Sequence, residues 1–189
     1  MNIKNAEKKV READFFLNKM IKHERWTLVV FGDREHFDFY LSAFLGAGMS
    51  VRDAFHVEQD RELNELVKKW KEVWEARLTR EQRCLWDFMR EDRKHEVHKG
   101  GSSRRPGTEN IDLAGTHRLK SATVTYDYPL GLLRMQLPTY YFTIDGTERK
   151  VTEACGEYLA LLERMVAAFK ADRRMRRMIL LRVAHDGGA

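Results

Sequence analysis

Cysteine and long apolar runs are both scarce in this sequence of 189 residues, and each shortage excludes a class of protein. Two cysteines cannot build the disulfide framework of a small secreted domain, and Cys84 and Cys155 each lie alone, without a partner at metal-ligand spacing. No window reaches the roughly 18 consecutive apolar residues of a membrane helix, and the N-terminus lacks the apolar run of a secretory signal. We therefore expect a soluble, cytoplasmic protein with two free, buried thiols and no membrane contact.

Internal repeats and low-complexity tracts are also absent from the sequence. With 43% hydrophobic residues, the chain is long enough for one sizeable core and too short to make two domains the expectation. We therefore predict a single domain over residues 1–189.

Hydrophobic residues recur at the three- and four-residue spacing of an amphipathic helix in five parts of the chain. These parts cover about residues 3–24, 37–55, 61–78, 79–100 and 152–169. The second part is rich in small residues, including Gly46 and Gly48, so we expect neighbouring helices to approach its backbone closely. The third is predicted to bury Leu63, Leu66, Trp70, Val73 and Trp74.

Polar residues mark the ends of two of these helices. Thr79 and Gln82 have the spacing of a capping box at the start of the fourth helix, and Thr152 is predicted to cap the last one. Gly100 and Gly101 are suited to ending the fourth helix.

The periodicity changes between about residues 111 and 151. The segment SATVTYDY alternates, and LLRMQLPTYYFTI is rich in β-branched and aromatic residues. Asp145 and Gly146 then form a strong hairpin signal, whereas the earlier stretch GGSSRRPGTEN predicts a loop. The expected fold is therefore mainly α, an up-and-down bundle of four to five helices with a small antiparallel insertion of two to four strands before the last helix.

The net charge is +5, and the basic residues are unevenly distributed. Arg104 and Arg105 lie together in the predicted loop. A larger group near the C-terminus contains Arg173, Arg174, Arg176 and Arg177. Such clusters attract phosphate backbones, but the C-terminal group is equally well explained as the solvated end of a basic helix, where cations complement the helix dipole.

Arg93 is the unusual residue of the fourth predicted helix. At about 100° per residue, it falls on the apolar stripe of this helix, between Met89 and Val97. A guanidinium directed at a core is strongly unfavourable unless it is paired and hydrogen-bonded. Either Arg93 forms an ion pair, with Glu96 one turn on or with an acid of another helix, or the stripe opens here into a polar cleft or a subunit interface.

His98 lies about 140° around the helix from Arg93, so the two do not share a face of a regular helix. The glycines that follow would let the helix unwind at Lys99 and bring the imidazole near the guanidinium. Such a pair suits phosphodiester cleavage, because the histidine moves a proton on or off a ribose hydroxyl and the arginine neutralises charge that develops on the phosphate. This reaction requires no metal or other cofactor.

Glu91, His95 and His98 form a competing set, since their spacings on a helix would allow them to hold a divalent metal. No further ligand follows at a suitable spacing, and Glu/His pairs are common on helix surfaces. We therefore predict no metal site.

The segment RKHEVHKG, Arg93 to Gly100, resembles the motif of the HEPN superfamily, in which a late helix ends in an arginine, a polar residue, three more residues and a histidine. The segment FYLSAFLGAGMSV, Phe39 to Val51, also looks like the second helix of bacterial members. The resemblance covers roughly residues 6–100 and, more loosely, the last helix. The residue after the arginine is usually a small polar one such as asparagine, and here it is Lys94.

The resemblance implies an α-helical bundle, commonly a homodimer that brings two Arg/His pairs together across a shared cleft. Active members are metal-independent endoribonucleases of toxin–antitoxin and other defence systems, so a cognate antitoxin is an implied partner besides RNA. On this basis Arg93 and His98 are the candidate catalytic residues. The candidate residues for binding RNA are Lys94, Arg104, Arg105, Arg173, Arg174, Arg176 and Arg177.

Two functions stay open on the sequence. One is an endoribonuclease or RNA-processing protein, and the other is a non-catalytic dimeric binding module in which Arg93 and His98 form a buried network. Enclosure and ion pairing of Arg93 within one subunit would favour the module, whereas an open cleft beside His98 would favour the enzyme. A nucleotide-binding sensor between the helices is a third class, with no motif in its support.

Overall fold

The computed structural model describes residues 3–26, 34–55, 60–99, 101–113, 133–172 and 175. Within these ranges the chain forms five helices and three strands, which are α1 (Ile3–Trp26), α2 (Arg34–Asp53), α3 (Arg61–Ala76), α4 (Arg80–Lys99), β1 (Arg105–Leu113), β2 (Leu133–Ile144), β3 (Thr147–Lys150) and α5 (Val151–Ala171). The prediction of a mainly helical fold with a small antiparallel sheet before the last helix is confirmed. None of the described helices is both long enough and apolar enough to cross a membrane.

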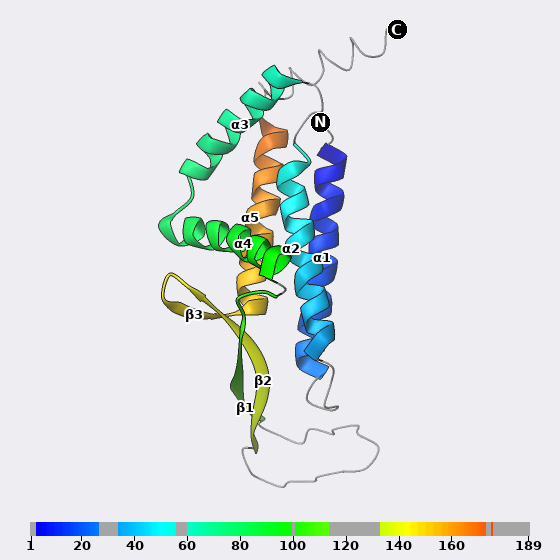
Figure 1. Ribbon diagram of the computed structural model, residues 1–189, viewed down its shortest axis with the longest axis vertical. Coiled ribbons are helices and arrows are strands. Elements are labelled where there is room, and N and C mark those ends of the chain that lie inside the picture. The colour runs from blue at the N-terminus through cyan, green and yellow to red at the C-terminus, as the bar shows by residue number, and fades with distance from the viewer. Residues whose placement is uncertain are drawn as a thin grey trace.

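Three of the helices, α1, α2 and α5, lie alongside one another, and α4 lies across α2 and α5 (Figure 1). α3 leads away obliquely and packs on the end of this group through Trp70, whose ring centre lies 4.8 Å from that of Phe169 in α5. The sheet extends from the other side of α4 (Figure 1). The crossing of α4 over α2 is the feature that positions the candidate site.

The small residues of α2 let α5 approach its backbone, as the sequence predicts. A Cβ added at Gly48 would lie 2.8 Å from Cε1 of Tyr158, closer than real Cβ contacts occur. The predicted inner face of α5 is confirmed, and its buried members are Cys155, Tyr158, Leu162, Met165, Val166 and Phe169. Cys155 is a free thiol, and Cys84 in α4 is also free but only half-buried.

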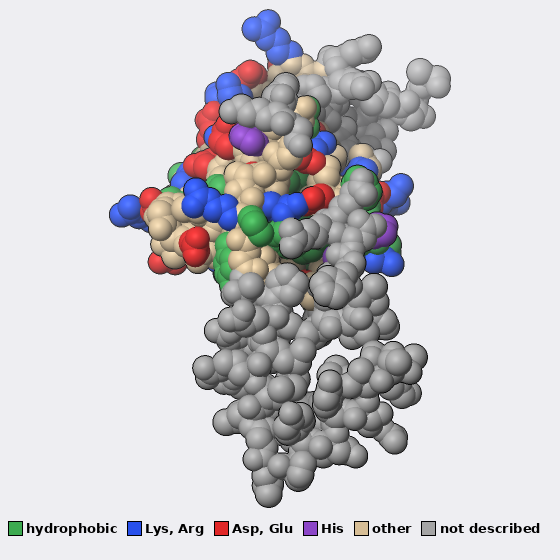
Figure 2. Space-filling model, turned by 60° about the horizontal axis from the view of Figure 1, so that its bottom comes forward, with side chains coloured by type: hydrophobic (Ala, Val, Ile, Leu, Met, Phe, Trp, Pro, Cys, Tyr) green, Lys and Arg blue, Asp and Glu red, His purple; other side chains and the backbone are tan. Residues whose placement is uncertain are grey.

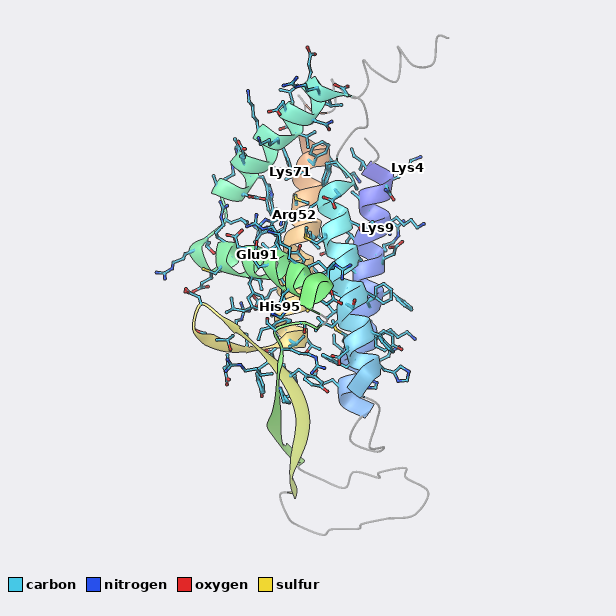
Figure 3. All side chains as sticks on the ribbon, viewed as in Figure 1. Lys4, Lys9, Arg52, Lys71, Glu91 and His95 are labelled. Atoms are coloured by element: carbon cyan, nitrogen blue, oxygen red, sulfur yellow. The ribbon has the colours of Figure 1, made fainter. Side chains whose placement is uncertain are left out.

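A polar network joins α2, α3, α4 and α5 near this contact. The Arg52 guanidinium donates to Glu75 at 3.2 Å and lies 4.6 Å from the centre of the Trp86 ring. The indole nitrogen of Trp86 donates to the same carboxylate at 3.0 Å. Lys71 donates to the carbonyl oxygen of Arg52, and both of these residues are labelled in Figure 3. Burial raises the pKa of Tyr158 to about 12, against the opposite influence of the nearby Arg52 cation.

The strands form one antiparallel sheet in the order β1-β2-β3. The hairpin between β2 and β3 turns at Asp145 and Gly146, which have φ of 48° and 76°, as the Asp-Gly pair predicts. The alternating segment SATVTYDY, also predicted as a strand, lies outside the described residues.

The prediction of a loop over residues 105–110 is wrong, because β1 begins at Arg105 and pairs with β2 from there on. Pro106 and Gly107 weaken the strand signal of this segment, but β1 lies at the edge of the sheet formed by the described strands, where proline is tolerated. Pairing with the strongly β-forming β2 overrides the low local propensity. The β insertion therefore begins earlier than the predicted residue 111.

The two predicted threonine caps have different outcomes. The capping box at α4 is confirmed, since the Gln82 N–H donates to Thr79 Oγ1 at 3.3 Å and the Thr79 N–H donates to Gln82 Oε1 at 3.2 Å. The prediction for α5 is wrong, because Lys150 takes the cap position without a side-chain bond. Thr152 is buried and donates instead to Glu24 of α1 at 2.9 Å, so a tertiary contact uses the hydroxyl.

The predicted inner face of α3 is right for Leu63 and Trp74, which are buried, and wrong for Val73, which is exposed. The helix buries Val67 instead. Val73 is about 100° around the helix from Trp74, so burying the larger ring turns the valine toward the edge of the contact.

Candidate functional site

The side of α4 that faces the core carries acidic residues in its last two turns. Leu85 and Met89 are buried, and the same helical stripe continues through Asp92, which is buried, and Glu96, whose side chain is 14% exposed. Val97 was predicted to lie on this stripe but is 58% exposed, so that prediction is wrong. Because α4 crosses α2 instead of running along it, the crossing decides which face of the last turns meets the core (Figure 1).

Arg93 lies against α2 at the crossing. A Cβ added at Gly46 of α2 would lie 3.5 Å from Nη2 of this arginine, so the missing side chain makes room for the guanidinium. Nη1 donates to a carboxylate oxygen of Glu96, one turn further along α4. The ion pair that the sequence offered as one explanation is therefore present, yet the Arg93 side chain stays 31% exposed.

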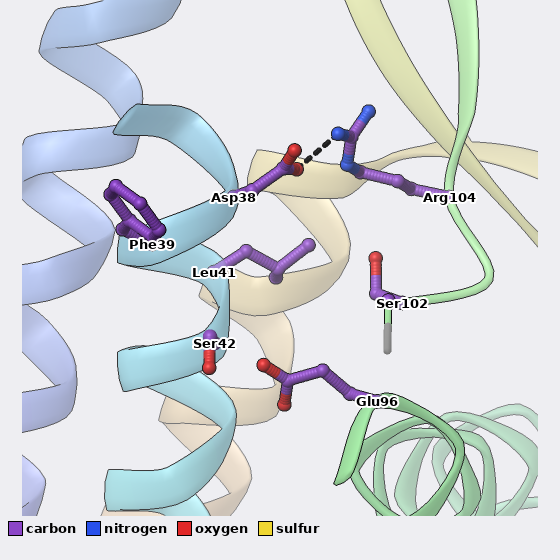
Figure 4. Close-up of a pocket in the computed structure, with 8 residues that line it drawn as sticks. Asp38, Phe39, Leu41, Ser42, Glu96, Ser102 and Arg104 are labelled. Atoms are coloured by element: carbon purple, nitrogen blue, oxygen red, sulfur yellow. Dashed lines mark ion pairs between the residues drawn. The ribbon is translucent and has the colours of Figure 1, made fainter. Parts of the chain in front are cut away.

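A pocket of about 540 Å³ opens between α2 and the end of α4, and we refer to it as the α2–α4 pocket. Its lining residues are Asp38, Phe39, Leu41, Ser42, Glu96, Gly101, Ser102 and Arg104. Figure 4 shows the Glu96 carboxylate pointing across the pocket toward Ser42, whereas the Phe39 ring points to the other side of α2. The partner of Arg93 therefore forms part of the pocket wall.

Arg104 closes one end of the α2–α4 pocket (Figure 4). Its guanidinium pairs with Asp38 on the opposite wall and lies 4.2 Å from the centre of the Tyr140 ring. Tyr140 is itself buried and stacks on Phe37 with 4.5 Å between the ring centres. These contacts hold Arg104 in a fixed place at the edge of the pocket.

Asp92 anchors the segment that carries Ser102 and Arg104. Its Oδ1 accepts the backbone N–H of Ser103 at 2.6 Å, and its Oδ2 is buried with no hydrogen-bond partner in the described part of the chain. Burial raises the pKa of this carboxyl group, although the bonds from Ser103 act in the opposite direction. The sequence prediction missed Asp92, and the available signal was its three-residue spacing from the buried Met89.

Two other candidates for RNA binding lie at the surface. Lys94 is exposed and donates to Glu91 at 2.9 Å, a bond that lowers the pKa of the Glu91 carboxyl group. Arg105 is exposed at the start of β1. Figure 2 shows basic and acidic side chains intermixed over the described surface in that view, and not separated into patches of one sign.

The remaining candidates lie outside the residues whose side chains the structure describes, and they are His98, Arg173, Arg174, Arg176 and Arg177. The backbone of α4 is helical up to Lys99, so the helix extends as far as predicted, but it does not unwind at Lys99, the change that was expected to bring the His98 imidazole near Arg93. The structure therefore groups Arg93, through Glu96, with Arg104 at one pocket, and the pairing of Arg93 with His98 stays a prediction.

The members of the competing metal set make other contacts where they are described. Nδ1 of His95 lies 2.9 Å from the carbonyl oxygen of Gly101, and Glu91 accepts from Arg90 as well as from Lys94 (Figure 3). Among the described residues, no group of three His, Cys, Asp or Glu side chains is placed to hold a metal ion.

No protein-family model, curated protein or solved structure matches this chain. The resemblance to the HEPN superfamily therefore rests on the residues of the motif.

Proposed function

We propose that this chain is a HEPN-like, metal-independent endoribonuclease whose reaction centre lies at the C-terminal end of α4. The observation that supports this most is the state of Arg93. Its guanidinium fits against α2 where Gly46 has no side chain, and it pairs with Glu96. The Arg93 side chain nevertheless stays 31% exposed, beside a pocket large enough for a nucleotide.

In the proposed reaction, Arg93 binds the scissile phosphate and His98 transfers a proton. A guanidinium has five N–H donors, and the bond to Glu96 engages Nη1, so donors are left for a phosphate oxygen. The positive charge of Arg93 would stabilise the additional negative charge of the transition state. His98 suits proton transfer because an imidazole titrates near neutral pH.

The basic residues beyond this pair would hold the RNA backbone. Arg104 lies at the edge of the α2–α4 pocket, and Lys94 and Arg105 are exposed near it in the sequence. The C-terminal arginines extend the proposed set. Phosphate contacts of this kind position the RNA but do not select its sequence.

The test is cleavage of mixed cellular RNA in EDTA by the purified wild-type protein and by His98→Ala. His95→Ala is the matched control, because His95 stands five residues after Arg90, as His98 stands after Arg93. We expect wild type and His95→Ala to cleave and His98→Ala to lose about 100-fold or more of the rate. Unchanged cleavage by His98→Ala, or no cleavage by wild type, would reject the proposal.

A second function has support from one observation, the ion pair of Arg93 with Glu96. A guanidinium that is already compensated within its own helix suits a non-catalytic helical module equally well. The implied homodimer fits both functions, and the exposed apolar side chains of Phe39 and Val97 lie on the two helices that form the site. A protein that sedimented as a dimer, bound RNA or a partner protein and cleaved no RNA would be this module.

A further inference from the structure

We propose that Glu96 is the general base of the reaction, which accepts the proton of the attacking ribose 2′-hydroxyl. This inference rests on the proposed endoribonuclease function and adds a third catalytic residue to Arg93 and His98. No part of the Arg/His motif calls for a carboxylate at this position, so the inference comes from the contacts of Glu96 alone.

Glu96 has the two contacts that such a base needs. One carboxylate oxygen accepts from Nη1 of Arg93, and the side chain lines the α2–α4 pocket, where it points across toward Ser42 (Figure 4). The side chain is enclosed but not sealed, with 14% of its surface exposed. A carboxylate oxygen is therefore within reach of a group bound in the pocket.

The contact of Glu96 with Arg93 supports the assignment, because in RNA the attacking hydroxyl lies close to the scissile phosphate. The attacking 2′-hydroxyl stands on the carbon next to the one that carries the scissile phosphate. Since Arg93 is proposed to bind that phosphate, the base must lie directly beside Arg93, within hydrogen-bond distance of the hydroxyl. Asp38, the other carboxylate of the pocket, pairs with Arg104 at the far end of the site and does not meet this condition.

The chemical step balances without a co-reactant. Glu96 takes the proton of the 2′-hydroxyl while O2′ forms a bond to phosphorus, and the bond from phosphorus to O5′ breaks. His98, in its protonated form, gives a proton to O5′. Because it lies about 160° around a regular α4 from Glu96, this His98 is supplied by the second copy of the implied homodimer. The products are a 2′,3′-cyclic phosphate and a 5′-hydroxyl, and solvent then restores both protonation states.

The ligand class of the α2–α4 pocket follows from this assignment. A pocket of about 540 Å³ is in the size range for one small ligand, here the nucleoside on the 5′ side of the scissile bond. The ribose would lie toward Glu96 and Ser42. The substrate must therefore be an RNA with a free 2′-hydroxyl at the cleaved position, and a 2′-deoxy or 2′-O-methyl nucleotide there should block cleavage.

The first measurement compares Glu96→Gln with a matched control on the same helix. Asp87→Asn serves, because Asp87 also pairs with an arginine three residues away, at 3.4 Å, and is partly exposed. We expect Glu96→Gln to lose about 100-fold to 10,000-fold of the cleavage rate in EDTA and Asp87→Asn to retain it. Glu96→Gln cleaving within about threefold of wild type would overturn the inference. If wild type cleaves no RNA, the proposed function itself fails.

A second measurement separates the base from the acid. An oligonucleotide with sulfur in place of O5′ at the cleaved bond has a leaving group that departs without a proton. We expect this substrate to restore cleavage by His98→Ala and to leave Glu96→Gln inactive. Restoration of both variants, or of Glu96→Gln alone, would show that Glu96 is not the base.

Glu96→Asp covers the case in which Glu96→Gln fails to fold. The shorter side chain keeps the carboxylate but moves it away from the pocket, so we expect cleavage that is slower than that of wild type and still measurable. Thermal melting of each variant verifies folding. A folded Glu96→Asp that cleaved as fast as wild type would contradict a base at this position.

Discussion

Two arginine–glutamate pairs lie along the contact of α2 with its neighbours, and they differ in their surroundings. Arg52 and Glu75 come from different helices, with side chains 13% and 20% exposed, and Trp86 both stacks on the arginine and donates to the glutamate. Arg93 and Glu96 come from one helix, and the pair lies beside a pocket. The first pair links two helices among aromatic rings, whereas the second is the pair that we propose acts on a ligand.

The largest effect should come from removing each arginine. We expect Arg52→Ala to lower the free energy of unfolding by about 1.5–3 kcal/mol, because the Glu75 carboxylate loses its 3.2 Å bond to Arg52 and keeps only Trp86 at 3.0 Å and Arg83 at 3.5 Å among its described partners. Arg93→Ala should lower it by no more than about 1 kcal/mol, since its pair spans one helical turn and is partly exposed. Urea unfolding measures both. Equal losses would remove the distinction between the pairs.

The two glycines of α2 test how tightly the helix packs against Arg93 at one position and against Tyr158 at the other. We expect Gly48→Ala to lower the free energy of unfolding by about 1–3 kcal/mol, because the new Cβ would meet the buried Tyr158 ring at 2.8 Å. Gly46→Ala places its Cβ at an ordinary 3.5 Å from Arg93, so higher helix propensity should raise stability by up to about 1 kcal/mol. Thermal melting of the two variants gives the sign of each effect. A destabilised Gly46→Ala would mean that Arg93 is as tightly enclosed as Arg52.

We expect the smallest change in stability at Asp92, the buried carboxyl group next to Arg93 on α4. Burial raises its pKa above the ordinary 3.8, so the folded state favours the neutral carboxyl group. Its contribution to stability is complete below pH 3.8 and is lost as the pH rises through the raised value. Asn keeps an oxygen for the Ser103 N–H and carries no charge, so we expect Asp92→Asn to be more stable than wild type at pH 7 and nearly equal at pH 3. Urea unfolding at both pH values would reveal the opposite order if the ionised form were preferred.

Much of the fold could be predicted from the sequence, because periodicity reports which face of a helix meets the core. The small residues of α2 and the inner face of α5 were predicted correctly for this reason. Periodicity does not report where a helix stops following its neighbour. Val97 was therefore assigned to the core, although it is 58% exposed, four residues beyond the contact of Arg93 with α2.

The candidate site was only partly predictable. The ion pair of Arg93 with Glu96 follows from their spacing on one helix, and the sequence offered it as one explanation for an arginine on the apolar stripe. Asp92 was missed because a carboxylate on an apolar stripe is expected to be solvated, and its partner, the Ser103 N–H, belongs to a segment whose path the sequence does not specify. Arg105 was assigned to a loop because strand pairing is a long-range property, which local propensity does not report.

Arg93 is the residue proposed to act on RNA, and Arg90 provides its matched control, because Arg90 precedes His95 by the same five residues. The most direct measurement is the rate of RNA cleavage in EDTA by wild type, Arg93→Ala and Arg90→Ala, with the folding of each verified by thermal melting. We predict that Arg90→Ala cleaves like wild type and that a folded Arg93→Ala is slower by about 100-fold to 1,000-fold. Equal cleavage by the two variants, or a wild-type protein that leaves every RNA intact, would rule out this role for Arg93.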